Sequence, residues 1–210
     1  TVEGDGVRFD QPYGDLLVAT GAHAVTDPID GFEREMAFTM HGLDSAAAVR
    51  ATLADPGDQV VDTDIEYVDA ALVERYADRE PPERVAIVGG GYVGVEMAEA
   101  LRAHGLETHL FQRGPHLLKP FGEGVCERVA DHLREQGAEL HMNMPVSELA
   151  GGDRVEAVVH DDGRVPVDLA LVGIGVAPNT ELLDSTPVEL GESGAVSVDD
   201  YGRTTVDGVY

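Results

Sequence analysis

Short apolar runs alternate with helical segments through the middle of the chain. Val85–Val88, Leu106–Phe111 and Ala138–Met142 have the length and apolar character of buried strands. Val95–Ala103 and Glu123–Gln136, which lie between these runs, are predicted to be helices. Strands that alternate with helices in this way predict an α/β fold with a Rossmann-like parallel sheet.

The arrangement changes towards the C-terminus. Val155–His160 and Arg164–Asp168 flank Asp162-Gly163, a dipeptide that favours a tight hairpin turn. Leu169–Ile174 is apolar and predicts one more buried strand. An antiparallel β-meander is therefore expected beside the parallel sheet.

The first part of the chain has a weaker pattern, from which we expect short strands, an extended connection, two helices and a boundary. These are strands at Val7–Phe9 and Leu16–Ala19, a connection over residues 22–43, helices at Ala46–Leu53 and Ile65–Tyr76, and a boundary at Pro81-Pro82. Asp44 or Ser45 is the expected N-cap of the first helix.

Three glycines follow the first central strand in the order G-x-G-x-x-G. Gly89 permits a tight turn, Gly91 lets the backbone approach a pyrophosphate, and Gly94 lets the helix pack closely on the strand. Tyr92 and Val93 lie between the last two glycines, where a helix N-terminus attracts anions. A glycine-rich turn in an unrelated α/β protein is the alternative. The order of strand, turn, helix and strand favours a dinucleotide site.

The net charge of the chain limits the kinds of molecule that it can bind. The chain has 210 residues, with 40 acidic and 14 basic side chains, and a formal net charge of −26. Because nucleic-acid binding needs a basic surface, no nucleic-acid partner is expected. Scattered acidity of this degree is a halophilic strategy, so we expect a salt-adapted cytoplasmic protein that resembles those of extremely halophilic archaea.

Other features exclude further classes of site and location. No apolar run approaches the length of a membrane span, and no membrane partner is expected. The single cysteine, Cys126, fits a reducing cytoplasm and is interpreted as a small core or surface residue. The histidines show no metal-ligand spacing with Cys or Asp, so no metal site is predicted. The chain does not start with Met, which suggests a processed chain or part of a longer one.

Several stretches together resemble one family. They are Tyr13–Ala22, Phe38–Leu53, Arg84–Leu101, Gly173–Asn179 and Arg203–Tyr210. The chain is similar to the pyridine-nucleotide-disulfide oxidoreductases, which are FAD enzymes that take hydride from NADH or NADPH. Phe38–Leu53 is most similar to the branch of coenzyme A-disulfide reductases, NADH oxidases and NADH peroxidases.

The resemblance implies a domain organisation. It assigns residues 1–82 to part of an FAD domain and a connection, 83–180 to the NAD(P)-binding domain, and 181–210 to a return towards the FAD domain. The family's FAD-binding glycine motif, its redox cysteines and its C-terminal dimerisation domain are not present in these 210 residues. The resemblance therefore implies no catalytic residue in this chain, an inactive fragment on its own, and a homodimer at full length.

The end of the second central strand bears on the choice of nucleotide. NAD sites place Asp or Glu there to bind the ribose hydroxyls, whereas this chain has neutral Gln112 followed by Arg113. NADPH-dependent glutathione reductases resemble this stretch, which implies that Arg113 and Lys119 bind the 2′-phosphate. Ordinary surface cations are the alternative. We expect NADPH, with NADH as the second choice.

The resemblance also implies roles for residues outside the motif. It places Glu96 near the nicotinamide, Gly175 against the bound nucleotide, Phe121 over the adenosine side, and Thr20-Gly21 on the flavin side. Glu96 could instead be an acid in the first helical turn that complements the dipole, and Gly175 a plain turn after a strand.

The expected function is hydride transfer from NAD(P)H to FAD and onward to a disulfide of the coenzyme A type, a peroxide or oxygen. One alternative is a ferredoxin- or rubredoxin-reductase-like flavoprotein that has no redox cysteine. The other is a non-catalytic module that senses NAD(P).

Overall fold

The computed structural model describes residues 2–4, 6–55, 58, 68–77 and 79–210. The chain divides into two compact units, one made of Thr1–His23 with Val176–Tyr210 and the other of Ala24–Gly175. The domain boundaries after residues 82 and 180, which rest on the family resemblance, stay predictions. Within the described residues, no helix is long and apolar enough to cross a bilayer.

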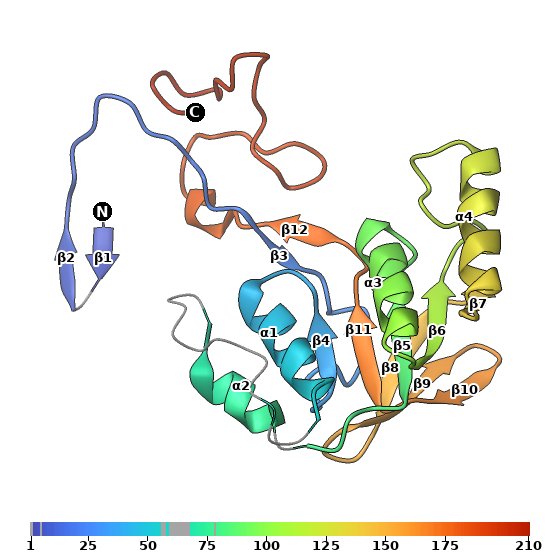
Figure 1. Ribbon diagram of the computed structural model, residues 1–210. Coiled ribbons are helices and arrows are strands. Elements are labelled where there is room, and N and C mark those ends of the chain that lie inside the picture. Colours follow the sequence, from blue (N-terminus) through green and yellow to red (C-terminus); the bar gives the residue numbers. More distant parts are fainter. Residues whose placement is uncertain (1, 5, 56–57, 59–67, 78) are drawn as a thin grey trace. The chain divides into compact units, whose positions relative to one another are not determined.

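A five-stranded sheet forms the centre of the larger unit (Figure 1). Its order is β4-β11-β5-β6-β7, and all four neighbouring pairs are parallel. The strands are β4 (Ala37–Thr39), β11 (Leu169–Val172), β5 (Arg84–Val88), β6 (Glu107–Gln112) and β7 (Glu139–Met142). The predicted parallel sheet, with its Rossmann-like order around β5, is confirmed.

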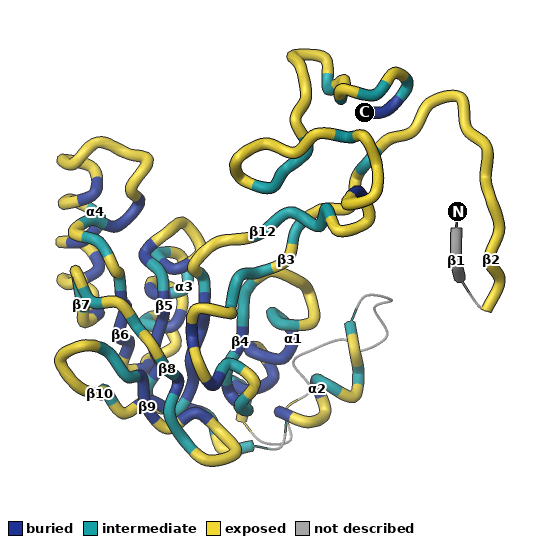
Figure 2. Tube along the Cα trace, turned by 180° about the vertical axis from the view of Figure 1, so that it is seen from behind, coloured by how far each residue is buried: buried dark blue, intermediate teal, exposed yellow. Residues whose placement is uncertain are grey.

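The sheet is covered on both faces, which explains its continuous apolar strands. Helices lie on one face and a β-meander on the other (Figures 1 and 2). The helices are α1 (Leu43–Thr52), α2 (Ala70–Ala77), α3 (Tyr92–Ala103) and α4 (Glu123–Glu135). The meander consists of β8 (Val146–Gly151), β9 (Val155–His160) and β10 (Gly163–Pro166), paired antiparallel in the order β10-β9-β8. The predicted meander is confirmed, and β8 is a strand that the sequence pattern did not indicate.

Helix α4 shows how sequence sets an element's ends and buried face. Cys126, Ala130 and Leu133 are its buried side chains. The helix ends before Gly137, whose φ of 88° suits glycine just past a helix C-terminus. The Cys126 thiol lies against the carbonyl oxygens of Leu118 and Phe121. A buried position in the core therefore accounts for this cysteine.

The smaller unit has little regular structure. Strands β1 (Val2–Gly4) and β2 (Val7–Phe9) form an antiparallel hairpin. Strands β3 (Ala22–Ala24) and β12 (Val176–Pro178) form a two-stranded sheet, and a 3-10 helix, η1, spans Glu181–Leu183.

Two predictions for the N-terminal strands and connection are corrected. The strand predicted at Leu16–Ala19 does not form: Leu16 makes an isolated bridge to Val209. The other predicted strand, Val7–Phe9, is β2, and it pairs with β1. The segment predicted as an extended connection over residues 22–43 contains β3 and β4. β4 has only three residues, too few to show a period, and its partner β11 is far away in the sequence.

Two predictions for helix starts are also corrected. Helix α1 starts at Leu43 after Gly42, so neither Asp44 nor Ser45 is its N-cap. The Asp44 carboxylate instead accepts the backbone N–H of Asp69 at 2.8 Å. Helix α3 starts at Tyr92, three residues before the predicted start.

Helix α2 spans Ala70–Ala77. The start of the helix predicted over Ile65–Tyr76 lies outside the described residues, but residues 68 and 69 are not helical. The Asp69 carboxylate accepts the N–H groups of Ala71 and Leu72, which is the hydrogen-bond pattern of an N-cap.

Candidate dinucleotide-binding site

The order of the strands locates the expected ligand position in the larger unit. From β5 the chain proceeds through β6 to β7 on one side, whereas β11 lies on the other side of β5. Ligands of open α/β sheets bind outside the carboxyl ends of the strands at such a switch point. Here the two carboxyl ends lead into Gly89 and Gly173, and the N–H of Gly173 donates to the Val88 carbonyl at 2.8 Å.

The glycines of the turn are required by close backbone contacts. Gly89 has a φ of +114°, and a Cβ on it would overlap the carbonyl oxygen of Gly173. A Cβ on Gly94 would overlap the carbonyl oxygen of Gly89. These contacts agree with the tight turn and the close packing of helix on strand that the motif predicts.

Gly91 has a different environment, which suits a ligand. It is the N-cap of α3, and no side chain caps this helix. The first N–H groups of a helix have no partner within the helix, so those that open α3 can bind an anion. A Cβ on Gly91 or on Gly175 would meet no atom within 4 Å, so the backbone is open at both positions. Tyr92 and Val93 follow Gly91 with exposed side chains.

The side chain of Gln112 joins the glycine turn to the loop that follows β6. Its Oε1 accepts the Gly90 N–H at 3.2 Å, and its Nε2 donates to the His116 carbonyl at 2.9 Å. The N–H of Leu118 donates to the Gly90 carbonyl at 2.8 Å, which adds a second link. Gln112, which occupies the position where NAD sites bind the ribose, therefore also supports the glycine turn.

Sequence reasoning missed Gly90 and Leu117 as parts of this support. A Cβ on Gly90 would clash with the Leu117 side chain, and Leu117 is fully buried. The run of three glycines at 89–91 could have indicated a role for Gly90, because the motif G-x-G-x-x-G requires only Gly89 and Gly91 of this run.

Both predicted phosphate cations are exposed. Within the described part of the chain, neither Arg113 nor Lys119 forms an ion pair with an acidic side chain, so both charges are available to a ligand. The Phe121 ring packs edge-on against Tyr92 of α3, with 5.9 Å between ring centroids. The loop after β6 thus brings cations and an aromatic ring to the same unit as the glycine turn.

Glu96 is exposed and lies in the second turn of α3, because the helix starts at Tyr92. The placement of Glu96 in the first turn was therefore wrong, and the helix dipole gives a weaker reason for this acid. Its proximity to the nicotinamide stays a prediction.

Thr20 and Gly21, predicted on the flavin side, belong to the smaller unit. The Thr20 hydroxyl donates to the Asn179 carbonyl at 2.5 Å, the Asn179 amide donates to the Thr20 carbonyl at 2.9 Å, and the Asn179 N–H donates to Gly21. These bonds join the two segments that form this unit.

The fold and the glycine turn of the larger unit define a Rossmann-like dinucleotide-binding domain. The chain matches the family model described as pyridine nucleotide-disulphide oxidoreductase over residues 1–210, and it belongs to this family.

Curated relatives support the assignment. The chain is 37% identical over 143 residues to an NAD(P)H sulfur oxidoreductase (CoA-dependent) of Pyrococcus abyssi, which covers 68% of this chain and 32% of the relative. It is 26% identical over its full 210 residues to an NADH oxidase of Methanocaldococcus jannaschii, of which it covers 41%. The chain thus spans well under half the length of these relatives.

Solved structures show the same fold. An NAD-dependent persulfide reductase from A. fulgidus has a TM-score of 0.80 at 25% identity, with 98% of this chain and 34% of that chain covered. An engineered water-forming NADPH oxidase bound to NADPH, made from a Lactobacillus brevis enzyme, has a TM-score of 0.73 at 20% identity, with 98% of this chain and 40% of that chain covered. Its substitutions include aspartate to alanine and, at the next position, alanine to arginine.

Proposed function

We propose that this chain is the NAD(P)H-binding part of a flavoprotein oxidoreductase that passes hydride from NAD(P)H to FAD and on to a disulfide, persulfide, peroxide or oxygen. The observation that carries this proposal is the glycine turn at the switch point between β5 and β11, in a chain of this family. The hydride chemistry belongs to the two cofactors, and the residues described above would hold and orient the dinucleotide.

Within this function we propose a preference for NADPH. A carboxylate at position 112 would repel a 2′-phosphate, whereas Gln112 is neutral, and Arg113 can bind phosphate oxygens in a fork. The engineered NADPH oxidase combines the same two features, the loss of an acid and the gain of an adjacent arginine. Lys119 adds a second exposed cation from the same loop.

Titration of the full-length protein with NADPH and NADH tests the preference. Replacement of both Arg113→Gln and Lys119→Gln should weaken NADPH binding by about 10- to 100-fold and leave NADH binding nearly unchanged, because two charge-assisted contacts are lost only for the phosphate. Gln112→Glu keeps the acceptor for the Gly90 N–H, loses the bond donated to the His116 carbonyl and adds a negative charge. Because the added charge repels a 2′-phosphate, it should shift the preference towards NADH.

Arg128→Gln is the matched control, since Arg128 is an exposed cation on α4 and outside the proposed site. Tighter binding of NADH than of NADPH by the unchanged protein would contradict the NADPH proposal. It would leave the proposed flavoprotein function intact.

The names of the relatives guide the choice of electron acceptor. Sulfur and persulfide reductases and NADH oxidases are all present among them. Flavin absorbance of the full-length protein, followed by reduction with NADPH and reoxidation by coenzyme A disulfide or by oxygen, would separate these acceptors. A protein without bound flavin would favour the nucleotide-sensing alternative.

We further propose that the full-length protein is a cytoplasmic homodimer adapted to high salt. A net charge of −26 with only 14 basic residues supports the salt adaptation.

A further inference from the structure

Two neighbouring strands bring three possible metal ligands together at the edge of the parallel sheet. In the β6·β7 pair, His109 is opposite Glu139, and Phe111 is opposite His141. Side chains alternate along a strand, so His109 and Phe111 share a face of β6. The Phe111 ring is 5.8 Å from His160 of β9, so this face is the one covered by the meander, away from α3.

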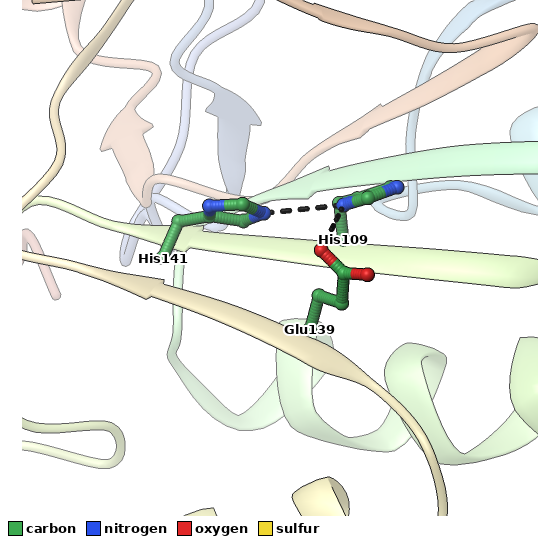
Figure 3. A group of neighbouring side chains, drawn as sticks. All are labelled: His109, Glu139 and His141. Atoms are coloured by element: carbon green, nitrogen blue, oxygen red, sulfur yellow. Dashed lines mark hydrogen bonds and ion pairs between the residues drawn. The ribbon is translucent and has the colours of Figure 1, made fainter. Parts of the chain in front are cut away.

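The three side chains converge on one another (Figure 3). His109 Nδ1 is 3.1 Å from His141 Nε2 and 3.4 Å from Glu139 Oε2. All three candidate ligand atoms lie within 4.8 Å of one another. Two ligand atoms bound to the same tetrahedral zinc ion at about 2.0–2.1 Å are about 3.3 Å apart. The two measured separations match that spacing.

The surroundings hold the two imidazoles in place. His109 is buried, and its Nε2 is 3.0 Å from the Glu107 carboxylate. A histidine that binds a metal through one nitrogen commonly donates the other N–H to a carboxylate in this way. The Phe111 ring stacks on His141 with 4.3 Å between centroids and 9° between planes, which fixes the second imidazole.

Without a metal, His109 Nδ1 and His141 Nε2 are close enough to share a hydrogen bond. A positive ion between these two nitrogens and the Glu139 carboxylate would replace that hydrogen bond with coordinate bonds.

We propose that His109, His141 and Glu139 bind one divalent transition-metal ion with the preferences of zinc, and that water occupies a fourth position. Imidazole nitrogens and a carboxylate oxygen suit this class of metal. Glu139 is exposed and β7 is the edge strand, so the ion can enter from solvent. The site is independent of the dinucleotide function.

The ligands escaped the sequence analysis because they come from two strands. His109 is on β6, whereas Glu139 and His141 are two residues apart on β7. Spacing along the chain gives no indication of a site that a β-ladder assembles.

Zinc titration of the metal-free, full-length protein, followed by calorimetry, tests the proposal. High potassium chloride in the buffer reduces weak binding to the acidic surface. We expect one zinc ion per chain. Glu139→Gln should weaken zinc binding at least about tenfold, because it removes a charged ligand at an exposed position and leaves the fold intact. His141→Gln should have a similar effect.

Glu135→Gln and His132→Gln are the matched controls, since both residues are exposed on α4. They should bind zinc as the unchanged protein does. Tetrahedral Co²⁺, used as a second probe, should give a visible absorption band that the Glu139 and His141 variants lack. The proposal is overturned if the unchanged protein binds no stoichiometric zinc, or if these variants bind it as tightly as the controls.

Discussion

At the scale of single residues, Glu35 shows how a charged side chain can hold the fold together. Its carboxylate accepts hydrogen bonds at 2.6 Å from both Arg75 and Arg79, which flank the Tyr76 ring at the end of α2. Hydrogen bonds from Arg79 and Arg75 lower the pKa of Glu35 to about 2. Folding therefore favours the charged carboxylate.

This lowered pKa predicts a pH-dependent contribution to stability. A group whose pKa is depressed on folding stabilises the protein above its ordinary pKa, and this contribution is lost as the pH falls through the folded value. Glu35→Gln should therefore lower the free energy of unfolding by about 1 kcal/mol near neutral pH, after allowance for solvent screening. The difference should shrink between about pH 5 and pH 2.

Urea unfolding of both proteins across this pH range is the measurement. Glu33→Gln is the control, because the Glu33 side chain is largely exposed and its ion pair with Arg34 is long at 3.6 Å. A difference between the Glu35 variant and the unchanged protein that stays constant down to the lowest pH would show that the carboxylate charge is not its cause.

Gln112 marks the limit of residue-level prediction from sequence. Its type and position follow from the end of β6, and these sufficed to predict a neutral residue where an NAD site has an acid. Its hydrogen bonds to Gly90 and His116 did not follow, because they depend on how the loop after β6 folds back over the glycine turn. Loop packing of this kind leaves no periodic pattern in the sequence.

At the scale of elements, the β5–α3 turn depends on Gly94. Gly94→Ala should lower the free energy of unfolding by about 2–4 kcal/mol and weaken NADPH binding, because the new Cβ would overlap the Gly89 carbonyl oxygen and push α3 away from the turn.

Thermal unfolding and NADPH titration of the full-length protein check this expectation. Gly124→Ala is a closely matched control, since Gly124 is also a helical glycine and a Cβ on it would meet no atom within 4 Å. It should raise stability by up to about 1 kcal/mol. Equal effects of the two substitutions would mean that helix propensity, and not close packing, explains the glycine at position 94.

Elements were predictable where local pattern and long-range pairing agree. β5, β6, β7 and α4 have apolar runs or helical periods long enough to show in the sequence, and they form close to their predicted bounds. β4 and β8 were missed because each is defined by its partner: β4 by β11 and β8 by β9. The start of α3 was set too late because glycines were taken as part of the turn, whereas Gly94 lies inside the helix.

At the scale of the whole molecule, the net charge of −26 is the dominant electrostatic property. It was fully readable from composition, whereas no pattern in the sequence shows how strongly the folded chain resists its own repulsion. Few ion pairs are available to offset it, since acidic residues outnumber basic ones 40 to 14. Repulsion among like charges disfavours the compact state, and salt screens it.

The melting temperature should therefore rise by several degrees as potassium chloride increases from about 0.05 M to about 1 M, over which the Debye length falls from about 14 Å to about 3 Å. Calorimetric melts of the full-length protein at a series of salt concentrations would measure this. Screening acts mostly at the low end of the series, so the gain should flatten near 1 M, whereas solute exclusion from the surface grows steadily with concentration. Sucrose, which adds no ions, separates these two causes. A melting temperature that does not change with potassium chloride, or that rises equally with sucrose, would show that the acidic surface does not limit stability, and the proposed salt adaptation would then lose its physical basis.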